Sequence, residues 1–185
     1  MIHYTIAEEN TSPVFVTLEQ AKTHLRVDHT YEDTLIQGLI AAAITACEDY
    51  TGRLFGHHII HLHSDQFPKR TALEYGPLRT MDIGISYYDL QNTPQDYDSG
   101  NYRIITAYGK PPELIFTGAE SPPKVYSRHD AVRVSFQVGY QEQLPTPVYQ
   151  AVLLTLSDFY QYREDRKAIT ATRAMSLLRP YKKWV

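Results

Sequence analysis

The 185-residue chain has a single cysteine, no long apolar run and no excess of positive charge. One cysteine excludes a disulfide within the chain, and Cys47 falls on the apolar side of a helical pattern, where we expect a core residue. No apolar run reaches the ~18 residues of a membrane span. Residues 1–10 are polar and contain Glu8 and Glu9, unlike a signal peptide. We therefore expect a soluble protein made in the cytoplasm, with no membrane partner.

Catalytic and nucleotide-binding motifs are also missing. The chain has no GxSxG, no GxxxxGK[ST] and no GxGxxG pattern, so the usual serine nucleophile and phosphate-binding loops are absent. A formal net charge of −3 argues against a protein that holds nucleic acid through its overall charge. The sequence offers no coherent catalytic set, and we expect no catalytic residue and no cofactor.

One histidine cluster leaves an alternative open. His57, His58, His61 and His63 occur close together, and strand alternation would place His57, His61 and His63 on one face. Two imidazoles two residues apart can bind zinc, but a catalytic site needs a third ligand and an open position. We expect a solvated strand face without metal. A zinc-dependent enzyme that uses His57, His61 and His63 remains the alternative.

Two adjoining helices are the clearest structural signal. The spacing of Thr17 and Gln20 predicts a capping box at the start of a helix over Thr17–Val27. A second helix is predicted over Thr30–Thr51, with Thr30 as its N-cap and Gly52 as its left-handed C-terminal residue. Its wide apolar stripe consists of Leu35, Ile36, Leu39, Ile40, Ala43, Ile44, Cys47 and Tyr50.

The alanines of the second helix form a smooth wall at residues 41–43. Close packing against another helix of the same chain and contact with another subunit both fit this wall, and both remain open. A third long helix is predicted over Thr146–Glu164, with Thr146 as N-cap before Pro147. A short helical turn over Ala174–Leu178 follows.

Between these helices the apolar period changes from helical to two. Six short strands are predicted, at Ile59–Phe67, Thr71–Tyr75, Met81–Asp89, Asn101–Tyr108, Glu113–Thr117 and Ala131–Tyr140. Residues 91–100 read as a loop, and Met1–Pro13 as an edge strand or an arm. The fold class is therefore α+β. We expect one domain, with a helical core at 14–56 and 141–185 and a β-rich insert at 57–140.

The C-terminal tail, Arg173 to Trp184, is basic and aromatic. Docking into a partner protein, a plain solvated end and contact with DNA phosphates all fit it. Docking is favoured because a lone tryptophan is unfavourable in water and typical of interface hot spots. Fifteen tyrosines spread along the chain are a further, weaker sign of assembly.

The stretch TLEQAKTHLRVDHTYEDTLIQGLIAAAITACEDYTGRLF resembles the head–tail connector (adaptor) proteins of long-tailed bacteriophages and prophages. Their pattern is similar to "LEEAKxHLRV" followed by "D...DxLI..LI.AA...xE.YTGR". The matching residues are Leu18, Glu19, Ala21, Lys22, His24, Leu25, Arg26, Val27, Asp28, Asp33, Leu35, Ile36, Leu39, Ile40, Ala42, Glu48, Tyr50, Thr51, Gly52 and Arg53. Gln20 departs from the pattern but keeps the capping role. Later blocks, such as LPTPVYQAVLLTLSDFYQYRED and SLLRPYKKW, resemble the family more loosely.

The resemblance implies a non-enzymatic virion protein, located at the head–tail junction after assembly in the host cytoplasm. Such subunits form rings, usually about twelve-fold, below the portal. The implied partners are other copies of the chain, the portal protein, a tail or stopper protein, and DNA that passes through without sequence-specific binding. The implied portal-docking residues are Leu177, Leu178, Arg179, Tyr181, Lys182, Lys183 and Trp184. A DNA-binding packaging factor is the further alternative.

Overall fold

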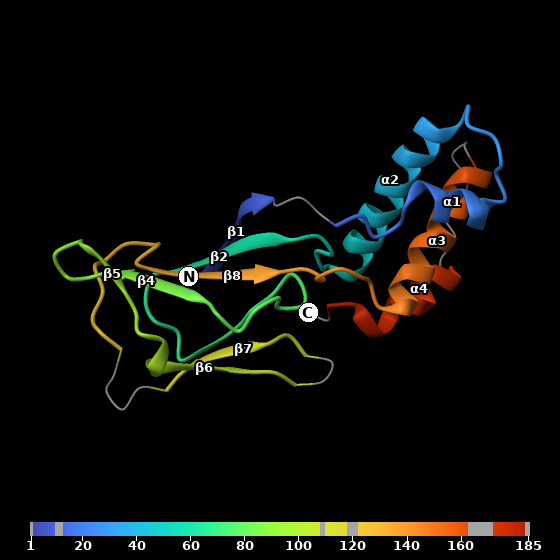
Figure 1. The fold of residues 1–185 in the computed structure, drawn as a ribbon. Helices are drawn as coiled ribbons and strands as arrows, with labels where there is room; N and C mark the ends of the chain where they lie inside the picture. The colour runs from blue at the N-terminus through green and yellow to red at the C-terminus, as the bar shows by residue number, and fades with distance from the viewer. Residues whose placement is uncertain (1, 10–12, 108–109, 118–121, 163–171, 184–185) are drawn as a thin grey trace. The chain divides into compact units, whose positions relative to one another are not determined.

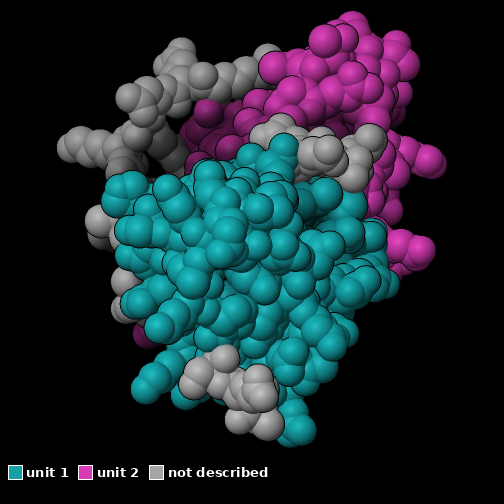
Figure 2. Space-filling model, turned by 90° about the vertical axis from the view of Figure 1, so that its left-hand side faces the viewer, with its two compact units in different colours: residues 1–12, 56–141 teal, residues 13–55, 142–185 magenta. Residues whose placement is uncertain are grey.

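The computed structural model describes residues 2–9, 13–107, 110–117, 122–162 and 172–183. The described part forms two compact units, unit 1 from residues 1–12 and 56–141 and unit 2 from residues 13–55 and 142–185 (Figure 2). Helices fill unit 2 and antiparallel strands fill unit 1 (Figure 1). The expected α+β class is confirmed. None of the helices in the described ranges combines the length and apolarity that a membrane span requires.

Unit 2 contains four α-helices and one 3-10 turn within these ranges. They are α1 (Leu18–Leu25), α2 (Asp33–Thr51), α3 (Thr146–Gln161), α4 (Arg173–Leu178) and η2 (Arg179–Tyr181). The capping box predicted at the start of α1 is confirmed. The Thr17 Oγ1 accepts from the Gln20 amide at 3.2 Å, and the Thr17 amide donates to Gln20 Oε1 at 2.9 Å. Gly52 ends α2 in the left-handed conformation, as predicted.

Two predicted N-caps are wrong. The N-cap of α2 is Glu32, and Asp33 is its first helical residue. Thr30 lies in the preceding turn, where its carbonyl accepts from the Asp33 amide at 3.2 Å. At the start of α3, the N-cap is Pro145, which has no hydroxyl, and Thr146 lies inside the helix. The predicted C-terminal end of α3, Glu164, lies outside the described residues.

The core of unit 2 is formed by the apolar faces of its helices. Ile36, Ile40 and Ala43 of α2 are buried, as are Val152 and Leu156 of α3, and the two helices lie side by side (Figure 1). These residues belong to the apolar stripe that the helical period predicts. Leu35, which was also predicted to lie in that stripe, is 40% exposed, because it lies about 100° around the helix axis from the buried Ile36.

Unit 1 contains two antiparallel sheets, which Figure 1 shows as two layers. The five-stranded sheet has the order β1-β2-β8-β4-β5, and the three-stranded sheet the order β3-β7-β6. Their strands are β1 (Ile2–Glu9), β2 (His58–Ser64), β3 (Arg70–Ala72), β4 (Gly84–Tyr88), β5 (Pro94–Asp96), β6 (Tyr102–Ile105), β7 (Glu113–Phe116) and β8 (Val132–Val138), with a 3-10 turn η1 (Ser99–Asn101).

The alternation predicted for the two central strands is confirmed. Ile60 and Leu62 of β2 and Val134 and Phe136 of β8 are buried, while Arg133 faces outward. Two tyrosine hydroxyls join the layers. Tyr4 of β1 donates to the Ala72 carbonyl at 2.7 Å, and Tyr102 of β6 donates to the Ile83 carbonyl at 2.9 Å. Burial of the Tyr4 phenol raises its pKa to about 12.

Strand β1 and the hairpin of β4 and β5 show which strands the apolar period predicts and which it does not. β1 is an edge strand, one of the two options for residues 1–13. β5 lies inside the predicted loop. The Asp89 carboxylate accepts from the Gln91 and Thr93 amides at 3.0 and 2.9 Å, and Asn92 has a φ of 60°. This tight turn lets β5 pair with β4 although β5 has no apolar alternation.

Candidate assembly surfaces

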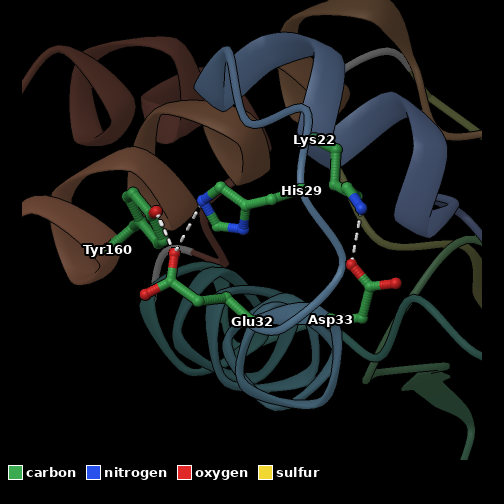
Figure 3. Close-up of polar contacts among 5 residues, drawn as sticks. All are labelled: Lys22, His29, Glu32, Asp33 and Tyr160. Carbon is green, nitrogen blue, oxygen red and sulfur yellow. Dashed lines mark hydrogen bonds and ion pairs between the residues drawn. The ribbon is translucent and has the colours of Figure 1, made fainter.

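The turn between α1 and α2 collects polar contacts from three helices (Figure 3). The Lys22 ammonium lies 2.6 Å from an Asp33 carboxylate oxygen, which ties α1 to the first residue of α2. The Tyr160 hydroxyl donates to Glu32 Oε2 at 2.5 Å, and His29 Nε2 lies 3.7 Å from the same oxygen. Glu32 and Asp33 stand at a helix N-terminus, where the backbone dipole favours carboxylates. The cluster therefore fixes α1, α2 and α3 relative to one another.

Tyr31 extends this turn outward. Its side chain is 81% exposed, and its ring stacks on the His29 ring at a centroid distance of 3.7 Å and an interplanar angle of 7°. Because His29 is held near Glu32, the tyrosine is displayed on a fixed base. An exposed, oriented aromatic ring of this kind is typical of protein interfaces.

The predicted docking residues begin in α4. Thr172 caps this helix, with its Oγ1 accepting from the Met175 amide at 3.1 Å. Leu178 is only 2% exposed and belongs to the core of unit 2. By contrast, Arg179 is exposed, and Leu177 and Tyr181 are half-buried. Trp184 lies outside the described residues.

After η2, the C-terminal segment runs along the end of α2. The Lys183 amide donates to the Thr51 carbonyl at 2.7 Å, and the Lys182 ammonium lies 5.0 Å from the centre of the Tyr50 ring. Cations at a helix C-terminus complement the backbone dipole. Lys182 and Lys183 thus contact α2 of their own chain, and this contact orients the residues before them.

A small hollow of about 310 Å³ lies among α2, α3 and α4. Its lining includes Cys47, Thr155, Asp158 and Arg173 among apolar side chains. Burial raises the pKa of the Cys47 thiol, and the nearest hydroxyl, that of Thr155, lies 3.7 Å from Cys47 Sγ. A thiol with a raised pKa holds little thiolate, so this hollow does not activate Cys47 as a nucleophile.

The histidines of unit 1 are arranged differently from the proposed zinc set. His57 Nε2 lies 3.2 Å from Gln137 Oε1. His63 instead stacks on His3 of β1, with ring centroids 4.9 Å apart, and the His61 ring lies 6.0 Å from that of His63. In the part of the chain that the structure describes, no group of three His, Cys, Asp or Glu residues is placed to hold a metal ion.

His3 is the member of this cluster that the sequence reasoning missed. Ile2, Tyr4 and Ile6 alternate, so His3 and Thr5 must face the other side of β1. Pairing of β1 with β2 then sets His3 opposite His63 and Thr5 opposite His61, and Thr5 Oγ1 lies 3.1 Å from His63 Nε2. Burial together with His3, His61 and Arg133 lowers the pKa of His63, although Asp130 opposes the shift.

In comparison with known proteins, the N-terminal part of the chain is similar to one family. Residues 15–77 match the family described as "Phage gp6-like head-tail connector protein". This segment contains α1, α2 and the strands β2 and β3. None of the curated proteins matches the chain.

Solved structures share the fold over almost the whole length. A chain from the neck of the empty gene transfer agent (GTA) particle, computed with C6 symmetry, is 20% identical with a TM-score of 0.73, covering 100% of this chain and 96% of that one. A chain from the virion of the native GTA particle is 20% identical with a TM-score of 0.75, covering 98% and 96%. A chain from the neck of the native GTA particle, computed with C12 symmetry, is 18% identical with a TM-score of 0.73, covering 98% and 96%.

At these identities the structural matches establish the fold, while the family match carries the sequence signature. The residues that suggested connector proteins, from Leu18 to Arg53, all lie inside the matched segment. The resemblance of this chain to the phage gp6-like head–tail connector proteins is therefore confirmed.

Proposed function

We propose that this chain is a structural virion protein, the subunit of a head–tail connector that joins a DNA-filled head to a tail. The observation that carries the proposal is the match of residues 15–77 to the connector family. The fold supports it, since it recurs in chains from particle necks and a virion over nearly their full lengths. The role is architectural and needs no reaction.

A ring is the form of assembly that we propose. Two of the structurally similar neck chains belong to particles computed with C6 and C12 symmetry, which fits a ring of about twelve copies. The clustered contacts of Lys22, Glu32 and Tyr160 keep the helices of unit 2 in one arrangement. A rigid helical unit is suited to repeated identical contacts around an axis.

The portal protein is the proposed partner of the C-terminal segment. Arg179 is exposed, Leu177 and Tyr181 are half-accessible, and the contacts of Lys182 and Lys183 with α2 orient the segment. We assign docking to these residues together with Trp184. A tail or stopper protein would bind the ring elsewhere, and DNA would pass through its channel without sequence-specific contacts.

The docking test compares two charge reversals. The variant Arg179→Glu is expected to lower co-sedimentation with portal protein of the same phage by tenfold or more. Arg103→Glu, an exposed site on β6, is the matched control and should co-sediment as the unmodified chain does. Equal loss in both variants, or in neither, would remove the C-terminal docking assignment and leave the connector assignment standing on ring formation.

A further inference from the structure

A groove of about 750 Å³ lies in unit 1, next to the turn that joins β4 and β5. Its apolar lining includes Phe67, Leu90 and Phe116, and Leu90 is 58% exposed. Two further lining residues, Lys69 and Lys124, are exposed, and neither ammonium group forms an ion pair within the described residues. The groove therefore combines an apolar lining with positive charge that its own chain does not neutralise.

This charge is complementary to a carboxylate. Asp65 is the one acidic residue among the described lining residues, and it already has an interaction partner in its own chain. A carboxylate that enters beside the two lysines gains charge-assisted hydrogen bonds, and an apolar side chain next to it gains burial. The occupant that fits the groove is therefore an apolar side chain adjacent to a carboxylate.

The loop before β4 carries such a pair. Met81 is 61% exposed, and Asp82 beside it is exposed as well. In the described ranges, the Asp82 carboxylate forms neither an ion pair nor a side-chain hydrogen bond. Of the other exposed large apolar side chains in these ranges, Tyr31 and Leu90 also adjoin a carboxylate, but both of those carboxylates accept hydrogen bonds within the chain.

The loop that holds Met81 is fixed at both ends. On one side, the Arg79 amide donates to a carbonyl of β8 at 2.9 Å, and on the other the Ile83 carbonyl accepts from the Tyr102 hydroxyl at 2.9 Å. Within the loop, the Thr80 hydroxyl donates to the backbone carbonyl two residues further on at 3.0 Å. A loop that is already held in one conformation loses less entropy when it binds.

The loop and the groove belong to opposite ends of β4. Met81 precedes the first residue of this strand and Leu90 follows its last, so a strand of five residues, about 16 Å long, lies between them. Met81 is not among the described residues that line the groove of its own chain. Two complementary surfaces at opposite ends of a subunit join copies head to tail, and such contacts can close into a ring.

We propose that Met81 and Asp82 of one copy enter this groove of the neighbouring copy. The inference rests on the proposed function, since the ring supplies the neighbour. An unbranched methionine side chain fits an irregular apolar space, and the Asp82 carboxylate pairs with Lys69 or Lys124. Because a stable interface covers about 800 Å² per partner, this contact is one anchor of the subunit interface and not the whole of it.

Charge exchange tests the contact. The groove variant combines Lys69→Glu with Lys124→Glu, and the loop variant is Asp82→Lys. The control variant combines Arg103→Glu with Lys110→Glu, which adds the same negative charge at exposed positions outside the groove lining. Native mass and negative-stain imaging give the concentration at half-assembly, with portal protein in every sample if the unmodified chain requires it. Thermal unfolding of the dilute variants reports the fold.

The groove variant and the loop variant are each expected to raise the concentration at half-assembly by about tenfold or more, because like charges then face each other. A chain that carries all three of these substitutions should assemble as the unmodified chain does. The control variant should assemble normally, and Asp82→Lys combined with the control pair should stay defective. The substituted positions are exposed, so the unfolding temperatures should not change.

Normal assembly of the groove variant or of the loop variant would overturn the contact. Loss of assembly that the combined substitutions do not restore would overturn it too, since the two surfaces would then not meet. A groove variant that forms rings but no longer binds the tail protein would assign the groove to that partner instead. In each of these outcomes, rings of the unmodified chain leave the connector function intact. An unmodified chain that forms no ring, with or without portal protein, would overturn both.

Discussion

At the residue scale, the helix ends show which capping residues can be predicted from the sequence. Gly52 was predictable, since glycine is the usual residue in the left-handed position after a helix. Arg26 has the same left-handed conformation after α1, with φ 59° and ψ 42°. An arginine side chain does not favour this conformation, so it could not be predicted from the sequence. Thr30 has the right chemistry for a cap but is used in a turn. Capping is therefore predictable where side chain and backbone agree, as at Thr17.

Gly38 inside α2 and Gly52 at its C-terminal cap are expected to respond in opposite ways to alanine. Gly52→Ala is expected to destabilise the fold by about 1–2 kcal/mol, since a non-glycine residue is strained at φ 66°. A Cβ there would also lie 3.4 Å from Lys183 Cβ. Gly38→Ala should stabilise the dilute chain by up to about 1 kcal/mol. Chemical denaturation of both variants measures this, and effects of the same sign would contradict it.

Arg26 provides a complementary prediction. Arg26→Gly is expected to stabilise the chain by roughly 0.5–1 kcal/mol, because relief of the left-handed strain exceeds the added entropy of the unfolded state. Gly substitution at Thr23, an exposed interior position of α1, is the control and should be destabilising. The urea concentration at the unfolding midpoint of each variant measures the change in stability. A lower midpoint for Arg26→Gly than for the unmodified chain would contradict the prediction.

The Tyr160–Glu32 contact is expected to contribute measurably to the stability of unit 2. Tyr160→Phe removes a hydroxyl that donates to a carboxylate at 2.5 Å, and the loss should be about 1–2 kcal/mol. Tyr149→Phe on the same helix is the matched control, with no hydroxyl hydrogen bond among the described residues. Thermal unfolding compares the two. Equal destabilisation would mean that the contact is not specific.

At the scale of elements, the apolar period predicts the helices and strands that bury one face in the core. The long helices and the strands β2 and β8 alternate in step with their burial, so their type and inward faces could be predicted. β5, with the sequence Pro-Gln-Asp, is exposed throughout and exists because a tight turn places it beside β4. The histidine cluster likewise depended on a strand pairing. Contacts that arise from pairing, rather than from local pattern, could not be read from the sequence.

The histidine cluster predicts a pH dependence of unit 1. Since the folded-state pKa of His63 lies below its ordinary value of about 6.5, the unfolded chain binds more protons in that range. Stability should therefore fall as pH drops through about 6.5 towards the folded-state pKa. His3, His61 and Arg133 face His63 and oppose its protonation, and Asp130 favours it.

The measurement is chemical denaturation between pH 5 and 8, with His63→Gln as the comparison. The unmodified chain should lose more stability on acidification than His63→Gln, because the variant has no proton to gain at that position. Identical pH profiles for the two proteins would show that the cluster has no part in the acid response.

At the scale of the whole molecule, the family signature lies in one segment and the function in an assembly. Residues 15–77 were enough to indicate a connector, because the helix pair has many matched positions at fixed spacing. The assembly surfaces were not predictable to the same degree. Leu178 was expected at a docking surface but lies in the core. A helix as short as α4 has too few apolar residues for their spacing to predict which side of it is buried.

The alternatives predict a different behaviour of the purified chain. A packaging factor would bind DNA with an affinity that falls steeply with salt and depends on Lys182 and Lys183. With a net charge of −3 and both lysines placed at the end of α2, we expect no such binding at physiological salt. Fluorescence anisotropy with duplex DNA measures it. Salt-sensitive binding lost in the double Lys182→Ala, Lys183→Ala variant would favour the alternative.

The central claim is that this chain is a ring-forming connector subunit, and native mass combined with negative-stain imaging tests it most directly. Over a wide range of concentrations, alone and with portal protein, the account predicts closed rings of about twelve subunits. Rings with portal protein only would mean that the portal triggers assembly. A chain that stays monomeric at every concentration, with portal protein present as well as absent, would contradict the account.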